Sequence, residues 1–360
     1  MHPAETDLPF WIDLALISGL GPERLRHLLN TFGSPPSIYS ASSTQLEKVL
    51  PPPLAQRIAS GIDKAAAEPV MRWLEEDPNN HILTWADFDY PQALLDIHDP
   101  PFLLYAKGRL ELANRPSLGI VGSRNATAGG EETAEAFAAA LSQEGLTIVS
   151  GLALGIDAAA HRGGLRGQGS SIAVVGTGLD RVYPARNREL AHQLAQDGLI
   201  LSENPLGTPV RGGLFPKRNR LISGLSQGVL VVEAALESGS LITAREAAEQ
   251  GREVFAIPGS IHSPLSRGCH ALIKNGAKLV ESAQDVLEEL NLEPSVPFTP
   301  SPESDDAPRL LQRCGFDPFT LDSLQQISGE ETSRLSGMLL SWELEGWVSP
   351  LGGGRYQRRR

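Results

Sequence analysis

The stretch of sequence that decides the fold is LGIVGSRNATAGG, residues 118–130, in which a short apolar run ends in a glycine turn and a helical stretch follows. Five more apolar runs follow at intervals suited to intervening helices: LTIV (146–149), IAVV (172–175), LILS (199–202), VLVV (229–232) and EVFAI (253–257). Continuous Val, Ile and Leu runs that alternate with helices are typical of a parallel sheet covered on both faces. The sequence therefore predicts a doubly wound, Rossmann-like α/β domain with a mostly parallel sheet over residues 111–290.

Small residues follow several of these runs: Gly122-Ser123-Arg124, Ser150-Gly151, Gly176-Thr177-Gly178 and Ser238-Gly239-Ser240. The carboxyl ends of parallel strands share one edge of the sheet, where ligands bind at the point of strand-order reversal. Glycine backbone and helix amino termini suit this edge to phosphates, although a glycine turn can equally serve to pack a helix. Arg124 favours the phosphate interpretation through a bidentate contact, with a structural ion pair as the alternative.

The fingerprints of common nucleotide cofactors are missing from these turns. The first turn does not fit GxGxxG, and the second strand ends in Ser150-Gly151 with no acid before Asp157 to bind a ribose. No GxxxxGKS motif occurs. We therefore expect neither a dinucleotide nor a nucleoside triphosphate as a cofactor, and we expect no cofactor at all.

The stretch GLFPKRNRLISGL, residues 213–225, concentrates positive charge in a chain whose formal net charge is −12. Residues 116–285 hold 15 Lys and Arg against 16 Asp and Glu, and no acid occurs between Glu203 and Glu233. Local potential steers a charged partner more than total charge does, so the acidic average does not exclude a polyanionic ligand.

Pro216 indicates the first turn of a short helix over residues 217–225. Its helical spacing places Lys217, Arg220 and Gly224 on one side and Arg218, Leu221 and Leu225 on another. Cations near a helix amino terminus become favourable when an anion binds there. Phe215 is suited either to stack on a base, as in proteins that bind single strands, or to pack in the core.

The regions on either side carry different patterns. Residues 1–110 predict a helical module with a connector, and a glycine hairpin at Gly19-Leu20-Gly21 suggests either a helix-hairpin-helix phosphate contact or plain helical packing. Residues 291–308 have the Pro, Ser and acid content of a linker. Residues 309–360 predict three helices and a hairpin, as in a winged helix. The third helix carries Glu330, Glu331, Glu343 and Glu345 against Arg334, which favours a partner-binding or structural module over a duplex reader.

Catalytic and metal chemistry have weak signals. Cys269 lies between His262 and His270, but this spacing is not typical of zinc, so we predict no metal site. Glu233 and Glu237 are the nearest acids to the turns, where helix-cap or ion-pair roles compete with hydrolytic ones. With two cysteines in no framework, no basic n-region and no long apolar run, we expect a cytoplasmic protein that does not span the membrane.

The motifs also resemble a known family when they are taken in order. They are IVGSRNAT (120–127), IVSGLALGIDAAAH (148–161), AVVGTGLDRVYPARN (173–187), LSENPLGTPV (201–210), the run from FPKRNR to VFAIPG (215–259) and LIKNGA (272–277). Over about 170 residues they closely resemble the bacterial DNA-processing protein A family, also called DprA or Smf. The flanking regions resemble, more loosely, the SAM-like and winged-helix-like modules of many members.

This resemblance implies a dimeric protein without enzymatic activity that binds and protects single-stranded DNA. It also implies that the protein loads the RecA recombinase onto that DNA during natural transformation, the uptake that accompanies competence. The family's phosphate-holding residues fall on Arg124, Lys217, Arg218 and Arg220, and we assign Gly122, Ser123, Phe215 and Asn219 to the same site. A nucleoside-monophosphate-cleaving enzyme of related fold is the alternative, although the corresponding turn reads ESGSLITA instead of PGGxGT.

Overall fold

A nine-stranded sheet forms the centre of the computed structural model, which describes residues 7–292, 307–351 and 353–359. Its strands are β1 (Asn80–Thr84), β2 (Leu103–Gly108), β3 (Ser117–Val121), β4 (Thr147–Ser150), β5 (Ser171–Val174), β6 (Leu199–Ser202), β7 (Gly228–Val231), β8 (Glu253–Ala256) and β9 (Lys278–Leu279). They lie in the order β1-β2-β6-β5-β4-β3-β7-β8-β9. Strands β3 to β9 run parallel, whereas β2 pairs antiparallel with β6 and β1 with β2. The predicted mostly parallel, doubly wound sheet is confirmed.

Helices cover both faces of this sheet because successive strand residues point to opposite sides. In β3, Leu118 and Ile120 pack toward one face, whereas Val121 packs toward the other. The first face is covered by α7 (Ala128–Gln143), α8 (Ile156–Gly164), α9 (Arg188–Asp197) and α13 (Ala283–Glu289). The second is covered by α10 (Leu214–Leu225), α11 (Ser240–Glu249) and α12 (Arg267–Lys274).

The strand order fixes where the chain reverses direction across the sheet. From β3 the chain moves outward through β4 and β5 to β6, and α10 then carries it back to β7 on the other side of β3. The carboxyl ends of β3 and β7 therefore form the switch point, where doubly wound sheets bind ligands.

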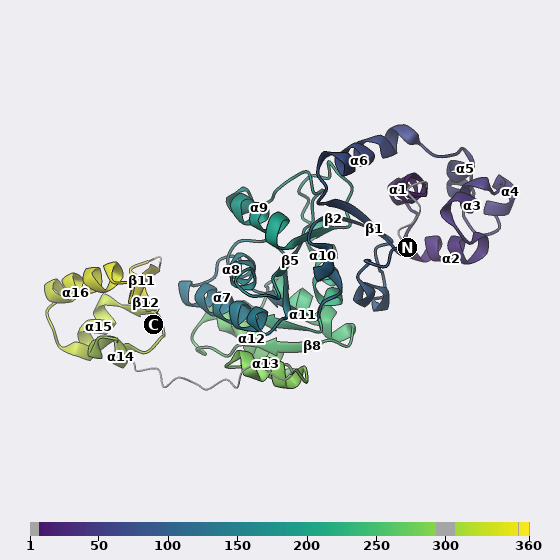
Figure 1. Cartoon of the computed structure of the whole chain (residues 1–360). Helices are drawn as coiled ribbons and strands as arrows, with labels where there is room; N and C mark the ends of the chain where they lie inside the picture. Colours follow the sequence, from purple (N-terminus) through teal and green to yellow (C-terminus); the bar gives the residue numbers. More distant parts are fainter. Residues whose placement is uncertain (1–6, 293–306, 352, 360) are drawn as a thin grey trace.

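The amino-terminal helices form a module of their own at one end of the molecule (Figure 1). They are α1 (Leu8–Leu16), α2 (Pro22–Phe32), α3 (Pro35–Ser40), α4 (Ser43–Leu46), α5 (Pro52–Ala59) and α6 (Lys64–Glu76). As predicted, α1 and α2 flank a glycine turn, and Gly19 adopts a left-handed φ of 84° that favours glycine there. The module shares its apolar core with the sheet, since Leu103 and Tyr105 of β2 and the preceding Phe102 pack among its helices.

The carboxy-terminal module lies at the other end (Figure 1) and has the predicted winged-helix architecture. It consists of α14 (Arg309–Cys314), β10 (Phe319–Thr320), α15 (Leu321–Ser328), α16 (Thr332–Leu344), β11 (Val348–Leu351) and β12 (Arg355–Arg358). Most of the predicted linker, residues 293–306, lies outside the described residues. An ion pair between Arg359 and Glu132 joins the module to α7.

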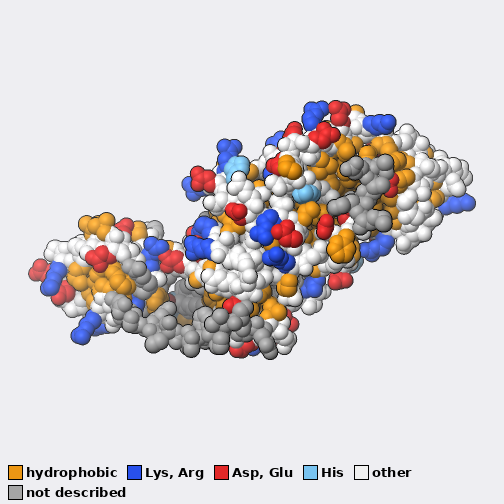
Figure 2. Space-filling view, in the orientation of Figure 1, with side chains coloured by type: hydrophobic (Ala, Val, Ile, Leu, Met, Phe, Trp, Pro, Cys, Tyr) orange, Lys and Arg blue, Asp and Glu red, His pale blue; other side chains and the backbone are white. Residues whose placement is uncertain are grey.

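Charged side chains of both signs are interspersed on the face of the α/β domain that Figure 2 shows. In the part of the chain that the structure describes, no helix combines the length and the apolar character needed to cross a bilayer.

Candidate nucleic-acid interface

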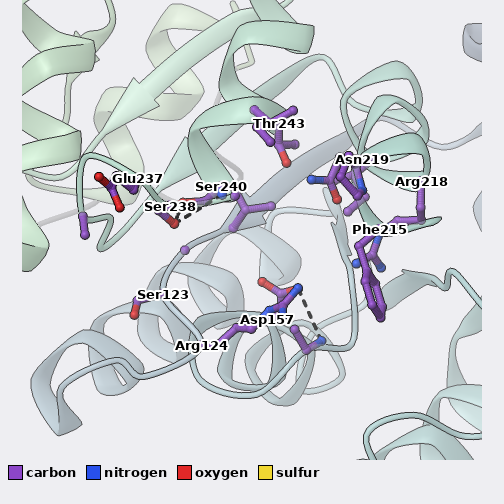
Figure 3. A pocket seen from close by; sticks show the side chains of 18 of the residues that line it. Ser123, Arg124, Asp157, Phe215, Arg218, Asn219, Glu237, Ser238, Ser240 and Thr243 are labelled. Atoms are coloured by element: carbon purple, nitrogen blue, oxygen red, sulfur yellow. Dashed lines mark hydrogen bonds between the residues drawn. The ribbon is translucent and has the colours of Figure 1, made fainter. Parts of the chain in front are cut away.

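A cavity of about 660 Å³ lies at the switch point of the sheet (Figure 3). Its walls come from the turn after β3, the start of α8, the first half of α10 and the start of α11. Eight of the residues that the sequence assigned to a phosphate or DNA site line it: Gly122, Ser123, Arg124, Phe215, Arg218, Asn219, Gly239 and Ser240. The structure thus brings together residues that are more than 100 positions apart in the chain.

The turn after β3 places Arg124 at the rim of the cavity. Ser123 donates its backbone N–H to the carbonyl of Glu233, at 2.7 Å, which ties this turn to the end of β7. A Cβ atom on Gly122 would lie 2.6 Å from Cγ1 of Ile156, so only glycine lets the turn pack this closely against α8. The exposed Arg124 side chain is therefore carried on a rigid support.

Phe215 lies in the first turn of α10, which begins at Leu214 and places Pro216 where its missing N–H does no harm. The Arg124 guanidinium carbon lies 5.3 Å from the centroid of the Phe215 ring, within cation–π range. The ring is partly buried and also contacts Tyr183, with centroids 5.9 Å apart. A cation and an aromatic ring thus meet at the cavity wall.

Arg218, which the sequence predicted as a phosphate clamp, lines the cavity but is buried. Its side chain is only 4% exposed, and Nη1 donates hydrogen bonds to the carbonyls of Gly151, at 2.6 Å, and Val174. Burial lowers the pKa of the guanidinium to about 10, while the nearby Asp157 acts to raise it, so the group stays charged at neutral pH. Arg218 forms the floor of the cavity and joins α10 to the ends of β4 and β5.

Two further titratable side chains lie buried near this floor. Asp157 accepts hydrogen bonds from the backbone N–H groups of Gly151 (3.2 Å) and Ala153 (3.4 Å), and burial raises its pKa while the Arg218 charge opposes the rise. His161 is fully buried between the N–H of Leu152 and the hydroxyl of Ser171. Burial, together with the Arg218 charge, lowers the pKa of His161 to about 3, so the imidazole is neutral.

Lys217 and Arg220 lie together on the other side of α10, as their spacing predicted, and both face Glu203. Arg220 Nη2 lies 2.7 Å from Oε2 of Glu203, and Lys217 Nζ lies 3.3 Å from the same oxygen. Neither cation is among the residues that line the cavity. Residues 204–232 contain no acid, but their cations still have an acidic neighbour in the folded protein. Strand β6 ends at the same edge of the sheet, and Glu203 directly after it contacts Lys217 and Arg220.

The remaining predicted turn residues lie outside the cavity lining. The Ser150 hydroxyl donates to the carbonyl of Ile120 at 2.6 Å, which joins β4 to β3. A Cβ atom on Gly176 would lie 3.5 Å from Phe215 Cδ1, so this turn supports the aromatic ring. On Gly178 a Cβ atom would lie 2.7 Å from the backbone carbonyl oxygen of Pro205, which indicates a packing requirement.

The start of α11 adds polar residues that were not assigned to DNA from the sequence. Ser238, Thr243 and Glu237 line the cavity beside Ser240 (Figure 3). The hydroxyls of Ser238 and Ser240 lie 2.7 Å apart and hydrogen bond to each other. Their signal in the sequence was the ESGSLITA segment itself, in which hydroxyl residues recur around a helix start.

Glu233 acts at a helix start and not in the cavity. Its carboxylate accepts hydrogen bonds from the backbone N–H of Thr127, at 2.9 Å, and from the Thr127 hydroxyl, at 2.7 Å, where α7 begins. Burial raises the pKa of Glu233 against the effect of these bonds. Within residues 7–292, 307–351 and 353–359, no cluster of three or more His, Cys, Asp or Glu side chains is arranged to hold a metal ion.

Comparison with known proteins gives two family matches. The family described as DNA recombination-mediator protein A matches residues 81–291, and the DprA winged helix domain matches residues 293–354. Protein Smf of Escherichia coli K12 is 43% identical over 317 residues, which cover 85% of this chain and 84% of that protein. The DNA processing protein DprA of Streptococcus pneumoniae R6 is 52% identical over 200 residues, which cover 56% of this chain and 71% of that protein.

Two solved structures are similar to this chain. The X-ray structure of DNA processing protein A from Streptococcus pneumoniae has a TM-score of 0.63 at 40% identity and covers 78% of this chain and 97% of its own. DNA processing protein A from Helicobacter pylori, described for its single-stranded DNA binding mode, has a TM-score of 0.54 at 32% identity and covers 59% of this chain and 96% of its own. The chain belongs to the DNA recombination-mediator protein A family, whose members are also named DprA and Smf.

Proposed function

We propose that this protein binds single-stranded DNA at the switch-point cavity, protects the incoming strand and loads the RecA recombinase onto it during natural transformation. The observation that carries the DNA-binding part is the pairing of Arg124 with Phe215 at the cavity wall. A cation for phosphates beside a ring for bases is the combination by which proteins hold single strands. Protection of the strand and RecA loading rest on membership of the family.

The proposed site uses the predicted residues unequally. Arg124 is the primary phosphate contact because it is exposed at the cavity rim. Gly122, Ser123 and Asn219 line the wall beside it and offer backbone and side-chain polar groups. Lys217 and Arg220 add a weaker attraction, since Glu203 neutralises part of their charge.

The division of labour along the chain is also a proposal. Residues 111–290 hold the DNA, residues 1–110 support them, and residues 309–360 contact a protein partner. In support of the last assignment, α16 exposes Leu340 and Leu344 beside Glu343, a surface that does not suit a DNA major groove. We further propose that the protein acts in the cytoplasm as a homodimer and without enzymatic activity. In support of the last point, both oxygens of the Glu233 carboxylate accept hydrogen bonds from Thr127, so this acid does not face the cavity as a general acid or base would.

Arg124→Ala tests the DNA-binding part. Fluorescence anisotropy with a labelled oligothymidylate across a salt series should show weaker binding, and the slope of log K against log salt should become shallower by ~0.7 for each phosphate that Arg124 no longer neutralises. Arg72→Ala is the matched control, because Arg72 is an exposed arginine that pairs with Glu68 on α6, away from the cavity. It should bind like the unmodified protein.

Two outcomes would contradict the proposal. If Arg124→Ala matches Arg72→Ala in affinity and in salt slope, the cavity does not hold the strand. If the protein releases bases from nucleoside monophosphates with multiple turnover, it is an enzyme. A competition between single-stranded and duplex oligonucleotides in the same assay should favour the single strand.

A further inference from the structure

Tyr183 presents an aromatic ring to solvent next to the proposed DNA site. It lies in the segment between β5 and α9, and the residue is 46% exposed. Its ring is 5.9 Å from the Phe215 ring between centroids, and the two planes are inclined by 35°. Exposed apolar residues are common on protein surfaces, so the exposure alone carries no conclusion. Its position beside Phe215 is the informative part.

The rings and the Arg124 guanidinium form a continuous row of planar groups. Arg124 lies over Phe215, and Phe215 contacts Tyr183. Among the described residues that line the cavity, Phe215 is present and Tyr183 is not. The row therefore leads from the cavity wall to the outer surface, the path that a strand leaving the cavity would follow.

Positive charge accompanies this outer end of the row. Arg181 and Arg186 are exposed on either side of Tyr183 in the sequence. Arg181 Nε lies 3.5 Å from Asp180, in an ion pair open to solvent and hence weak. Phe215 is the less accessible of the two rings, since it is partly buried under Arg124 and Tyr183.

We infer that Tyr183 is a second base-stacking position for single-stranded DNA, outside the cavity and next to the nucleotide held at Arg124 and Phe215. The inference rests on the proposed function and extends its footprint to the segment between β5 and α9. Stacking is tolerant of sequence, because every base has a π face, so this position adds affinity without selecting a base.

The test compares two substitutions of Tyr183, one that keeps an aromatic ring able to stack on a base and one that removes it. Tyr183→Phe retains an aromatic face, whereas Tyr183→Leu retains apolar bulk that would still shield Phe215 from water. In the full chain, Tyr183→Leu should weaken oligothymidylate binding by about 5- to 150-fold, the range for removing one base–aromatic stack. Tyr183→Phe should bind like the unmodified protein, and the salt slope should be unchanged in both variants because each keeps every phosphate-binding cation.

A fluorescent base reports the stacking directly. A single 2-aminopurine, moved one position at a time along an oligothymidylate, should be quenched by the unmodified protein and by Tyr183→Phe at the position that stacks on Tyr183, as well as at the neighbouring position that stacks on Phe215. In Tyr183→Leu the quenching at the Tyr183 position should vanish and that at the Phe215 position should remain, with thermal unfolding as the check that this variant is folded. If Tyr183→Leu keeps its affinity and the quenching at both positions while Arg124→Ala weakens binding, Tyr183 only packs on Phe215 and this inference fails alone. If Arg124→Ala also has no effect, the proposed function fails.

Discussion

At the scale of single residues, Arg218 shows that a basic residue of the predicted site can support the structure of the cavity without being an exposed contact for the ligand. It belongs to a basic cluster in the sequence, yet it donates hydrogen bonds to two strand-end carbonyls and lies near the buried Asp157. Removing one member of a buried charge pair leaves the other uncompensated in a region of low polarity. We therefore assign Arg218 a structural role, in which it stabilises the ends of β4 and β5.

Arg218→Met should lower the free energy of unfolding by about 3–5 kcal/mol, the range for breaking a buried charge pair. Urea denaturation measures this change, and Lys217→Met on the exposed side of α10 is the control, expected within about 0.5 kcal/mol of the unmodified protein. The double variant Arg218→Met/Asp157→Asn should recover part of the loss. A fully stable Arg218→Met that no longer binds DNA would instead make Arg218 a ligand contact.

At the scale of elements, α8 is held to the sheet by a histidine that must stay neutral. His161 accepts a hydrogen bond from the N–H of Leu152 after β4 and hydrogen bonds to Ser171 in β5. Its pKa of about 3 in the folded protein lies well below the value of about 6.5 for an unfolded chain. Between these values the unfolded state binds the proton first, so acid weakens the fold.

Stability should therefore fall as the pH drops below about 6.5, with a slope from His161 that approaches ~1.4 kcal/mol per pH unit near pH 5. Urea denaturation at several pH values from 7 to 5 measures it. Glutamine does not bind a proton in this pH range. In His161→Gln, the free energy of unfolding should therefore change less steeply with pH, by the ~1.4 kcal/mol per pH unit that His161 contributes. Parallel pH profiles for the two proteins would show that His161 is not the acid-sensitive group.

Elements were predictable where local pattern decides them. All six apolar runs became parallel strands, because their burial on both faces appears directly as continuous Val, Ile and Leu. Strands β1 and β2 were not predicted, since β2 joins the sheet by antiparallel pairing with β6, almost 100 residues further along the chain, and β1 joins it only through β2.

The candidate site was predictable in its location and less so in its members. The burial of Arg218 was within reach, because it shares a helix side with Leu221 and Leu225, which pack in the core. Glu203 and Tyr183 could not be assigned, because their contacts with α10 depend on how separate strand ends meet at one edge of the sheet.

At the scale of the whole molecule, the two terminal modules are attached in different ways. The helical module shares a continuous apolar core with β2, whereas the winged helix meets α7 through the ion pair of Arg359 with Glu132 and the approach of Gln357 to Gly129. An exposed ion pair contributes at most about 1 kcal/mol and is screened by salt. We therefore expect the carboxy-terminal module, and not the helical one, to detach when salt screens this ion pair.

Small-angle X-ray scattering measures this detachment as an increase in the radius of gyration. The radius should increase from low to high salt, and Arg359→Glu should increase it already at low salt, because two acids then oppose each other. The exchange Glu132→Arg/Arg359→Glu restores opposite charges and should restore the smaller radius. A radius that stays constant across salt and variants would mean that other contacts hold the module.

The shared core at the amino-terminal end has a consequence for how such proteins can diversify. Phe102, Leu103 and Tyr105 belong to the segment that enters the sheet, yet they fill the interior of the helical module. If recombination between genes transferred only the helices, these side chains would be exposed to water in one protein. In the other protein, the transferred helices would lack the apolar side chains that fill their core. At this end, the helices and strands β1 and β2 must therefore be inherited together. The winged helix, which shares no apolar core with the sheet among the described residues, can be gained or lost as a separate domain.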